Sequence, residues 1–293
     1  MALSGDGGTV EAAFGREALV RSHDGVLLRA SARNRRVQAV CGDRVMLSAI
    51  QGDQAVIDSV EPRRSEFARA SEHRVKVIAA NLTQVVILVA CEPSFDDELV
   101  CRLLIAAERS RLAALVVLNK VDLVDRYEEA RGKLAAFSGI GYSCVELSAK
   151  FDASPLRPHL TGQRSLLVGQ SGMGKSTLLK SLVPDAEVRT REISRHLDAG
   201  RHSTTACRLY ALDNDSEVVD SPGIAEFGLS GIRVRDLAGA FPEFAVHAAR
   251  CKFHDCRHQS EPACAVRAAA EQGQIHPRRF ALYRRIAHLE GAT

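Results

Sequence analysis

Apolar and polar residues alternate in short stretches over the first part of the chain. Strand-like runs of this kind occupy residues 25–30, 37–40, 43–47 and 54–60, and glycine or aspartate residues separate them. Short alternating strands with frequent turn signals are typical of a small barrel. We therefore predict an OB-fold barrel over residues 1–70, a fold that often binds RNA, with residues 1–15 poorly ordered.

From residue 71 onward the pattern changes to longer apolar runs. In residues 84–90 a continuous apolar run follows Gln84 and is typical of a buried strand, and residues 99–107 have the apolar spacing of a helix. Further strand-like runs follow at residues 115–118, 144–147, 165–168 and 217–219. Strands that alternate with helices indicate a mainly parallel sheet. We predict an α/β domain over residues 71–232 and a third domain over residues 233–293.

A glycine-rich segment, GQSGMGKST, follows the apolar run at residues 165–168 and precedes a helical run at residues 176–182. Its glycines and its Gly-Lys-Ser sequence match the phosphate-binding P-loop, whose backbone wraps around a phosphate and tolerates no Cβ there. In this motif Lys175 reaches the β- and γ-phosphates, and the Ser176 hydroxyl binds Mg²⁺. The predicted phosphate-binding residues are Gly169, Gln170, Ser171, Gly172, Met173, Gly174, Lys175, Ser176 and Thr177.

Two motifs that recognise guanine, NKVD and SAK, each follow a strand-like run. In N-K-x-D the Asp122 carboxylate accepts hydrogen bonds from the guanine ring, and adenine would leave this carboxylate unpaired at a considerable cost. The Asn119 side chain would brace neighbouring loops, and the Ala149 amide would meet the guanine oxygen. The predicted base-site residues are Asn119, Lys120, Asp122, Ser148, Ala149 and Lys150.

The order of these motifs differs from that of ordinary small GTPases, in which the phosphate loop precedes the guanine motifs. Here NKVD and SAK come before the phosphate loop. The parts are the same, but the chain enters the fold at a different point. We therefore predict a circularly permuted P-loop GTPase domain that binds GTP or GDP with Mg²⁺.

The sequence DSPG follows the last strand-like run of the α/β segment, and its first residue, Asp220, would hold Mg²⁺ together with Ser176. The amide of Gly223 would sense the γ-phosphate. Between this motif and the phosphate loop lies GRHSTT, where Thr204 or Thr205 would close over the γ-phosphate and Mg²⁺. The sequence does not distinguish between these two threonines.

The glutamine that commonly orients the attacking water in small GTPases is absent, because Ile224 and Ala225 follow the DSPG motif. His202 is the nearest candidate for this role, since an imidazole has two ring nitrogens and a near-neutral pKa. A histidine in a polar loop is also commonly just solvated. With His202 as the water-orienting group, we predict slow hydrolysis by the protein alone and fast hydrolysis when a partner orders the switch.

Cysteine and histidine residues cluster in the last part of the chain in the pattern C-x4-C-x-H-x5-C. Three thiolates and an imidazole form the closed tetrahedral set that structural Zn²⁺ prefers. The predicted zinc ligands are Cys251, Cys256, His258 and Cys264. The other reading is a group of reduced cysteines without metal.

Composition narrows the class of protein further. No run of about twenty apolar residues is present, so we expect no membrane span. A nucleotide-using protein without a secretory signal is expected in the reducing cytoplasm. Residues 233–293 hold ten Lys and Arg against six Asp and Glu, and Arg278, Arg279, Arg284 and Arg285 would contact RNA phosphates from a helix.

With these motifs in this order, the chain resembles the ribosome small-subunit-dependent GTPase A family (RsgA, also called YjeQ). Specific points of resemblance are CGDRV, AAN, NKVDL, GQSGMGKST, GRHSTT, DSPGIAEFGL and the cysteine–histidine set. The resemblance implies an OB-fold, a circularly permuted GTPase domain and a helical zinc-binding domain. It also implies binding to the small ribosomal subunit and its rRNA late in assembly, with subunit-stimulated hydrolysis and a catalytic role for His202. We expect a monomer.

Three other functions compete with this interpretation. A permuted GTPase acting on the large ribosomal subunit would lack this barrel and this zinc set. A zinc-stabilised rRNA-binding protein would use guanine nucleotide as a conformational clamp with little turnover. An ATPase or small-molecule kinase is opposed by NKVD and SAK.

Overall fold

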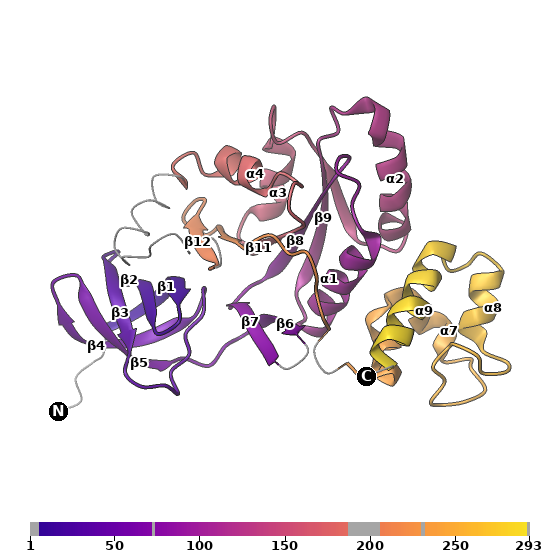
Figure 1. The fold of residues 1–293 in the computed structure, drawn as a ribbon, viewed down its shortest axis with the longest axis horizontal. Helices are drawn as coiled ribbons and strands as arrows, with labels where there is room; N and C mark the ends of the chain where they lie inside the picture. Colours follow the sequence, from indigo (N-terminus) through magenta and orange to yellow (C-terminus); the bar gives the residue numbers. More distant parts are fainter. Residues whose placement is uncertain (1–5, 72–73, 187–205, 230–231, 292–293) are drawn as a thin grey trace.

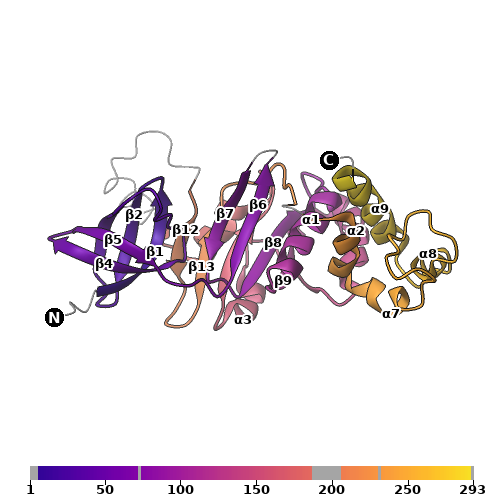
Figure 2. The same cartoon turned by 90° about the horizontal axis from the view of Figure 1, so that it is seen from below.

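The computed structural model describes residues 6–71, 74–186, 206–229 and 232–291. An N-terminal barrel, a central α/β part and a group of C-terminal helices follow one another along the length of the molecule (Figure 1). The view from below shows the same row, with the C-terminal helices at the end opposite the barrel (Figure 2).

The barrel consists of five strands that close on themselves. They are β1 (Asp6–Phe14), β2 (Glu17–Ser22), β3 (Leu27–Ala32), β4 (Arg44–Gln51) and β5 (Gln54–Val60). The strand order is β1-β2-β3-β5-β4, and β4 pairs back with β1. Val10, Val20, Leu28, Val45 and Ile57 point into the interior and are at most 2% exposed. The predicted OB-fold barrel is confirmed.

Two expectations for this region are wrong. The stretch 1–15 is expected to be poorly ordered, but residues 6–14 form β1, which pairs with both β2 and β4. Its glycines allow close strand packing, since a Cβ on Gly8 would lie 2.5 Å from a methyl carbon of Val20. Residues 37–40 form no strand, because the Val40 N–H donates to the Asp43 carboxylate and the Asp43 N–H donates to the Val40 carbonyl.

The central part contains a mainly parallel sheet, as predicted. Its strands are β8 (Gln84–Ala90), β9 (Ala113–Asn119), β10 (Ser143–Glu146), β11 (Arg164–Val168), β12 (Arg208–Ala211) and β13 (Glu217–Asp220). Their spatial order is β10-β9-β8-β11-β13-β12, and only β12 runs antiparallel to its neighbour β13. The strand that leads into the phosphate loop, β11, therefore lies in the middle of the sheet although it is late in the chain.

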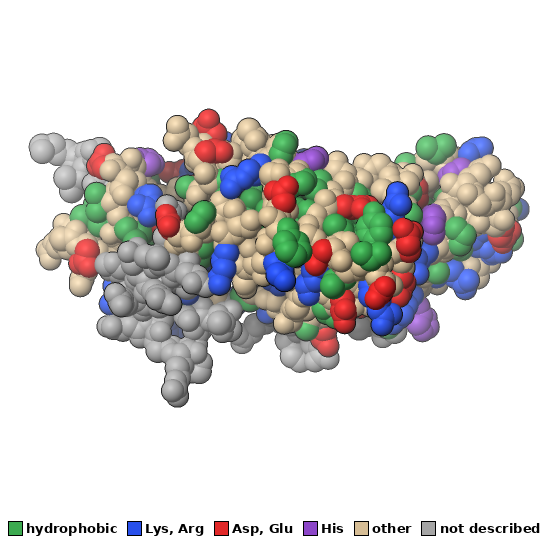
Figure 3. All heavy atoms as spheres, turned by 90° about the horizontal axis from the view of Figure 1, so that it is seen from above, with side chains coloured by type: hydrophobic (Ala, Val, Ile, Leu, Met, Phe, Trp, Pro, Cys, Tyr) green, Lys and Arg blue, Asp and Glu red, His purple; other side chains and the backbone are tan. Residues whose placement is uncertain are grey.

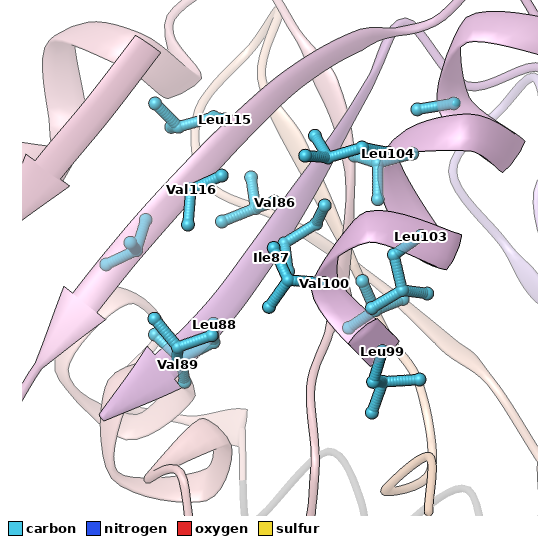
Figure 4. Packing of buried hydrophobic residues seen from close by; sticks show 14 of the residues in the cluster. Val86, Ile87, Leu88, Val89, Leu99, Val100, Leu103, Leu104, Leu115 and Val116 are labelled. Carbon is cyan, nitrogen blue, oxygen red and sulfur yellow. The ribbon is translucent and has the colours of Figure 1, made fainter. Parts of the chain in front are cut away.

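Helices cover this sheet and explain why its central strands are mostly apolar and buried. The segments are α1 (Asp97–Arg109), α2 (Val124–Ser138), the short η1 (Ser154–Leu156) and α3 (Arg157–Leu160), and α4 (Lys175–Leu182). Every residue of β8 is buried, as expected for a parallel strand with both faces covered. Val100 and Leu104 of α1 pack beside Val86 and Ile87 of β8 (Figure 4).

A hairpin of β6 (Glu66–Ser71) and β7 (Arg74–Ala80) lies between the barrel and α1 (Figure 2). The barrel and the α/β sheet are also joined directly, because Ala12 of β1 pairs with Arg208 of β12. The division expected at residue 70 falls within β6.

The C-terminal part is helical. Its helices are α6 (Val234–Leu237), η3 (Ala238–Ala240), η4 (Pro242–Phe244), α7 (Ala245–Ala248), α8 (Ala265–Glu271) and α9 (Pro277–Gly291). Phe241, Phe244 and Tyr283 pack against one another, with ring centroids 4.9–5.1 Å apart. Within the described ranges, no helix has the length and apolar character needed to cross a membrane.

Of the four arginines that the sequence predicts to contact phosphates, Arg279 is buried, whereas Arg278, Arg284 and Arg285 are exposed. Arg278 pairs with Asp97, Arg279 is fully buried beside Glu243, and Arg285 pairs with Glu98. Asp97 and Glu98, in the first turn of α1, form these ion pairs and also lie at the positive end of the helix dipole, which favours acidic side chains. Basic and acidic side chains are interspersed over the face seen from above, which shows no broad field of one sign (Figure 3).

Candidate nucleotide site and metal cluster

The phosphate loop connects β11 to the first turn of α4, and its glycines stand where a side chain would not fit. A Cβ on Gly169 would lie 2.4 Å from the Leu88 carbonyl oxygen. Gly174 has φ +95° and would place a Cβ 2.4 Å from the Asn119 side-chain nitrogen. Lys175 donates to the carbonyls of Gly169 and Gln170 at 2.7 and 3.0 Å. The loop therefore has the wrapped shape that the motif requires.

Asn119 lies at the end of β9 and joins the phosphate loop to the second guanine motif. Its side-chain nitrogen donates to the Met173 carbonyl at 2.9 Å, and its side-chain oxygen accepts from the Ala149 N–H at 2.9 Å. The residue is only 2% exposed. The two bonds hold the loops that carry NKVD and SAK and the phosphate loop in one arrangement.

The remaining base-site residues meet at the same edge of the sheet. The Asp122 N–H donates to the Ser148 hydroxyl at 3.0 Å, and this hydroxyl donates in turn to the Asp122 carboxylate. Lys120, at φ +61°, extends its amine to the Glu92 carbonyl at 2.6 Å. Lys150 lies over the ring of Phe151. Residues that are far apart in sequence are thus brought together where parallel strands end, the usual place for a ligand in such sheets.

The DSPG segment lies against the phosphate loop on the other side. The Ile224 N–H donates to the Gly169 carbonyl at 3.1 Å, and a Cβ on Gly223 would lie 3.6 Å from the Lys175 amine. Burial raises the pKa of Asp220 to about 6, although Lys175 and Arg208 act in the opposite direction. Burial likewise lowers the pKa of Lys175, against the effect of Asp220. An acidic and a basic side chain therefore influence each other in a poorly solvated place.

Ser176 and Thr177 begin α4 beside these groups and are exposed. Three of the predicted residues, His202, Thr204 and Thr205, lie outside the described residues.

The predicted zinc ligands form a compact group in the C-terminal part. The ligand atoms of Cys251, Cys256, His258 and Cys264 all lie within 4.8 Å of one another. The sulfurs of Cys251 and Cys264 are 4.0 Å apart, and His258 Nδ1 is 3.6 and 3.4 Å from them. Tetrahedral bonds of about 2.3 Å to sulfur would separate two sulfur ligands by about 3.8 Å, so the set fits one metal ion.

Two features of the site were not predicted from the sequence. Cys264 is also the N-cap of α8, since its sulfur accepts from the Arg267 N–H at 3.4 Å. The segment 91–96, which leads from β8 into α1, contacts the phosphate loop, where the Asp96 N–H donates to the Gln170 side chain at 3.2 Å. No local sequence signal reveals the second contact, because it joins residues that are distant in the chain.

These features define the class of protein. The phosphate-loop strand lies centrally, the strands carrying NKVD and SAK lie on one side, and the strand carrying DSPG lies on the other. The chain visits them in an order that starts with β8. This is a P-loop GTPase fold with circularly permuted connectivity.

The comparisons with known proteins agree with this class and specify the family. The sequence profile of the RsgA GTPase family matches residues 60–230. The small ribosomal subunit biogenesis GTPase RsgA of Nitrosospira multiformis is 44% identical over 279 residues, covering 95% of this chain and 89% of the relative. The protein of the same name from Ralstonia pickettii is 43% identical over 295 residues, covering 98% and 94%. The chain belongs to the RsgA GTPase family.

Solved structures show the same fold. The crystal structure of YjeQ from Thermotoga maritima has a TM-score of 0.77 and 27% sequence identity, covering 98% of this chain and 99% of that one. The structure of YloQ, described as a circularly permuted GTPase, has a TM-score of 0.73 at 23% identity and covers 98% and 96%.

Proposed function

We propose that the protein hydrolyses GTP to GDP and phosphate on the small ribosomal subunit, assists late maturation of that subunit and leaves it after hydrolysis. The structural observation that supports the nucleotide part is the pair of bonds from Asn119 to the phosphate loop and the second guanine motif. The ribosomal part is supported by relatives over 40% identical that are named small ribosomal subunit biogenesis GTPases. Its partners would then be this subunit and its rRNA, and its location the cytoplasm.

Each residue of the base site would make a different contact with guanine. The Asp122 carboxylate would accept from the guanine ring, and its bond with the Ser148 hydroxyl already orients it. The Lys120 stem would lie along the base, with its amine held by the Glu92 carbonyl. The Ala149 amide, which donates to Asn119, would lie beside the guanine oxygen.

The phosphate and magnesium positions are supported by the charges next to α4. Phosphates beside Lys175 would supply the negative charge that favours its protonated form, and this matters because burial lowers its pKa. Asp220, whose pKa burial raises to about 6, and the Ser176 hydroxyl would hold Mg²⁺. Bound Mg²⁺ would neutralise charge on the transferred phosphate.

The hydrolytic water would be oriented by a residue other than the one that follows DSPG. Ile224 occupies that position, is 3% exposed and uses its backbone N–H to bond the phosphate loop. His202 would orient the water, and Thr204 or Thr205 would close over the γ-phosphate. Ordering of this switch by the ribosomal subunit would then raise the rate of hydrolysis.

The cysteine–histidine group would hold one structural Zn²⁺. All four ligand positions are filled by protein atoms, which leaves none for a reacting water. The barrel (1–70), the GTPase part (71–232) and the zinc part (233–293) would be the three domains of a monomeric protein.

The first experiment measures GTP and ATP hydrolysis with and without purified small subunits. The expected result is slow turnover of GTP only, rising at least about tenfold with the subunit, as partner-supplied groups do in related enzymes. Equal turnover in both conditions would remove the ribosomal coupling. A protein that binds guanine nucleotide and the subunit without turnover would be the conformational clamp instead.

The base assignment has its own test. Asp122→Asn should shift the preference of the enzyme from guanine towards xanthine nucleotides, because the amide can donate where the carboxylate accepted. An unchanged preference would show that Asp122 does not contact the base.

A further inference from the structure

We infer that Arg278 and Arg285 of α9 are positioning residues for the phosphate loop, and that they act through the start of α1. The inference rests on the proposed nucleotide binding by that loop. It assigns to the C-terminal helix an effect on nucleotide affinity, in addition to its part in enclosing the metal cluster.

The first step is the contact between α9 and α1. Arg278 pairs with Asp97, and Arg285 Nε lies 2.7 Å from a Glu98 carboxylate oxygen. The other Glu98 oxygen is 3.0 Å from Arg102 Nε, so this carboxylate is held from two sides. The side chains of Asp97 and Glu98 are only 17% and 12% exposed, which reduces screening by solvent. We call these pairs the α9 latch.

The second step is a buried arginine that fixes α9 against the GTPase part. Arg279 is fully buried, with Nε 2.8 Å from a Glu243 carboxylate oxygen and Nη1 3.2 Å from the Cys101 sulfur of α1. Its guanidinium also stacks on Phe241 and lies near Phe137 of α2. Because a guanidinium is planar and its donors are fixed in direction, these contacts permit little sliding between α9 and α1.

The third step runs from α1 to the nucleotide site. The N-cap residue of α1 is Asp96, whose carboxylate accepts from the Glu98 N–H at 2.9 Å. The backbone N–H of Asp96 donates to the Gln170 side chain at 3.2 Å. Gly172 also packs on the same segment, since a Cβ there would lie 3.3 Å from the Pro93 ring.

Together these contacts form a continuous path from the C-terminal helix to the phosphate loop. The latch holds the first turn of α1, this turn fixes Asp96, and Asp96 orients the side chain of Gln170. The Gln170 backbone carbonyl accepts from Lys175, so its placement also affects the lysine that would meet the phosphates. Loosening the latch should leave the loop more mobile and weaken nucleotide binding.

The test is a cycle of variants of the full-length protein, with affinity for fluorescent GDP as the measurement. The variants are Arg278→Ala/Arg285→Ala, Gln170→Ala and the combination of all three changes. Arg284→Ala is the matched control, because Arg284 lies on the same helix and is exposed. Metal content and the unfolding midpoint of each variant show whether the C-terminal part remains folded, and the milder Arg278→Gln replaces the double change if it does not.

We expect loss of the latch to weaken GDP binding about threefold or more, within the range for residues that couple two sites. Gln170→Ala should also weaken binding, and the latch changes should then add little to it. A latch variant with wild-type affinity for GDP would overturn the inference. It would also be overturned if the latch changes weakened GDP binding equally in the wild-type and the Gln170→Ala background. Failure of the wild-type protein to bind GDP would instead overturn the proposed function.

Discussion

Asn119 is the residue whose replacement tests most directly how the nucleotide site is held together. Asn119→Ala removes the donor to the Met173 carbonyl and the acceptor for the Ala149 N–H, both at 2.9 Å. Met173 and Ala149 are 2% and 4% exposed, so water does not easily replace the lost partner. The change leaves the predicted contacts with phosphate and base chemically intact and affects only their arrangement.

The cost can be worked from the two bonds. Each lost bond leaves a buried backbone group unpaired at a cost of about 1–3 kcal/mol, so the nucleotide-bound protein should lose at least about 2 kcal/mol relative to the unfolded chain. If the loops stay in place in the free protein, this loss appears as lower stability. If they relax, nucleotide binding must order them again, and the loss appears as roughly thirtyfold weaker affinity or more. The two losses should add up to the same total.

The assay therefore measures both quantities on each variant. Unfolding by denaturant is followed by circular dichroism, because the chain contains no tryptophan. GDP affinity is measured by titration.

Asn81→Ala is the matched control for this assay. Asn81 makes the same kind of two-bond bridge, from its nitrogen to the Gly42 carbonyl at 3.0 Å and from the Arg64 N–H to its oxygen at 2.9 Å. It should lose stability but keep wild-type GDP affinity, since its bridge lies away from the nucleotide loops. The reasoning is refuted if Asn119→Ala changes the summed free energy by less than about 0.5 kcal/mol. It is also refuted if Asn81→Ala weakens GDP binding as much.

Three further changes test the metal cluster, the buried arginine and the loop glycines. Cys264→Ser should abolish stoichiometric zinc while the serine hydroxyl still caps α8, and zinc retained after gel filtration would contradict the ligand assignment. Arg279→Ala should lower the free energy of unfolding by about 3 kcal/mol, because it leaves the buried Glu243 carboxylate unpaired. Arg284→Ala should change the free energy of unfolding by less than about 0.5 kcal/mol. Equal effects of the two changes would refute the buried pair. Gly174→Ala should abolish GDP binding, since φ there is +95° and the new Cβ would clash with the side-chain amide nitrogen of Asn119. The control is Gly132→Ala, in open space on α2. It should stabilise the protein by up to about 1 kcal/mol without changing GDP affinity.

Strands with continuous apolar runs were predictable from the sequence. Residues 84–90 are predicted as a buried strand and coincide with β8, and the helical spacing at residues 99–107 lies within α1. In these elements local periodicity and burial agree, because the strand is covered on both faces and the helix packs on it with one side.

The elements that were missed depend on partners far away in the chain. β1 contains two adjacent glycines and resembles a flexible end, yet its pairing with β2 and β4 closes the barrel. Residues 37–40 are apolar enough for a strand, but their backbone is used by the Asp43 turn. The pairing of Arg278 with Asp97 spans 181 positions, and no local pattern indicates it.

Circular permutation gives these distant contacts a functional meaning. Because the chain enters the sheet at β8, the DSPG motif is the last of the GTPase motifs, and the polypeptide continues from it towards α6. On this stretch Ala70 of β6 donates its N–H to the Gly228 carbonyl, so the hairpin next to the barrel is tied to the segment after DSPG. Further along, α9 returns to α1, and α1 reaches the phosphate loop through Asp96. The segment that would sense the γ-phosphate is therefore linked to the phosphate loop twice, once directly through Ile224 and once through the C-terminal part that contains the cysteine–histidine group. In an unpermuted GTPase the chain would instead run on from this motif into the strand of the NKxD side. The permutation thus connects both flanking parts to the segment that would sense the γ-phosphate. A large partner that touched both parts would be able to influence hydrolysis through these connections.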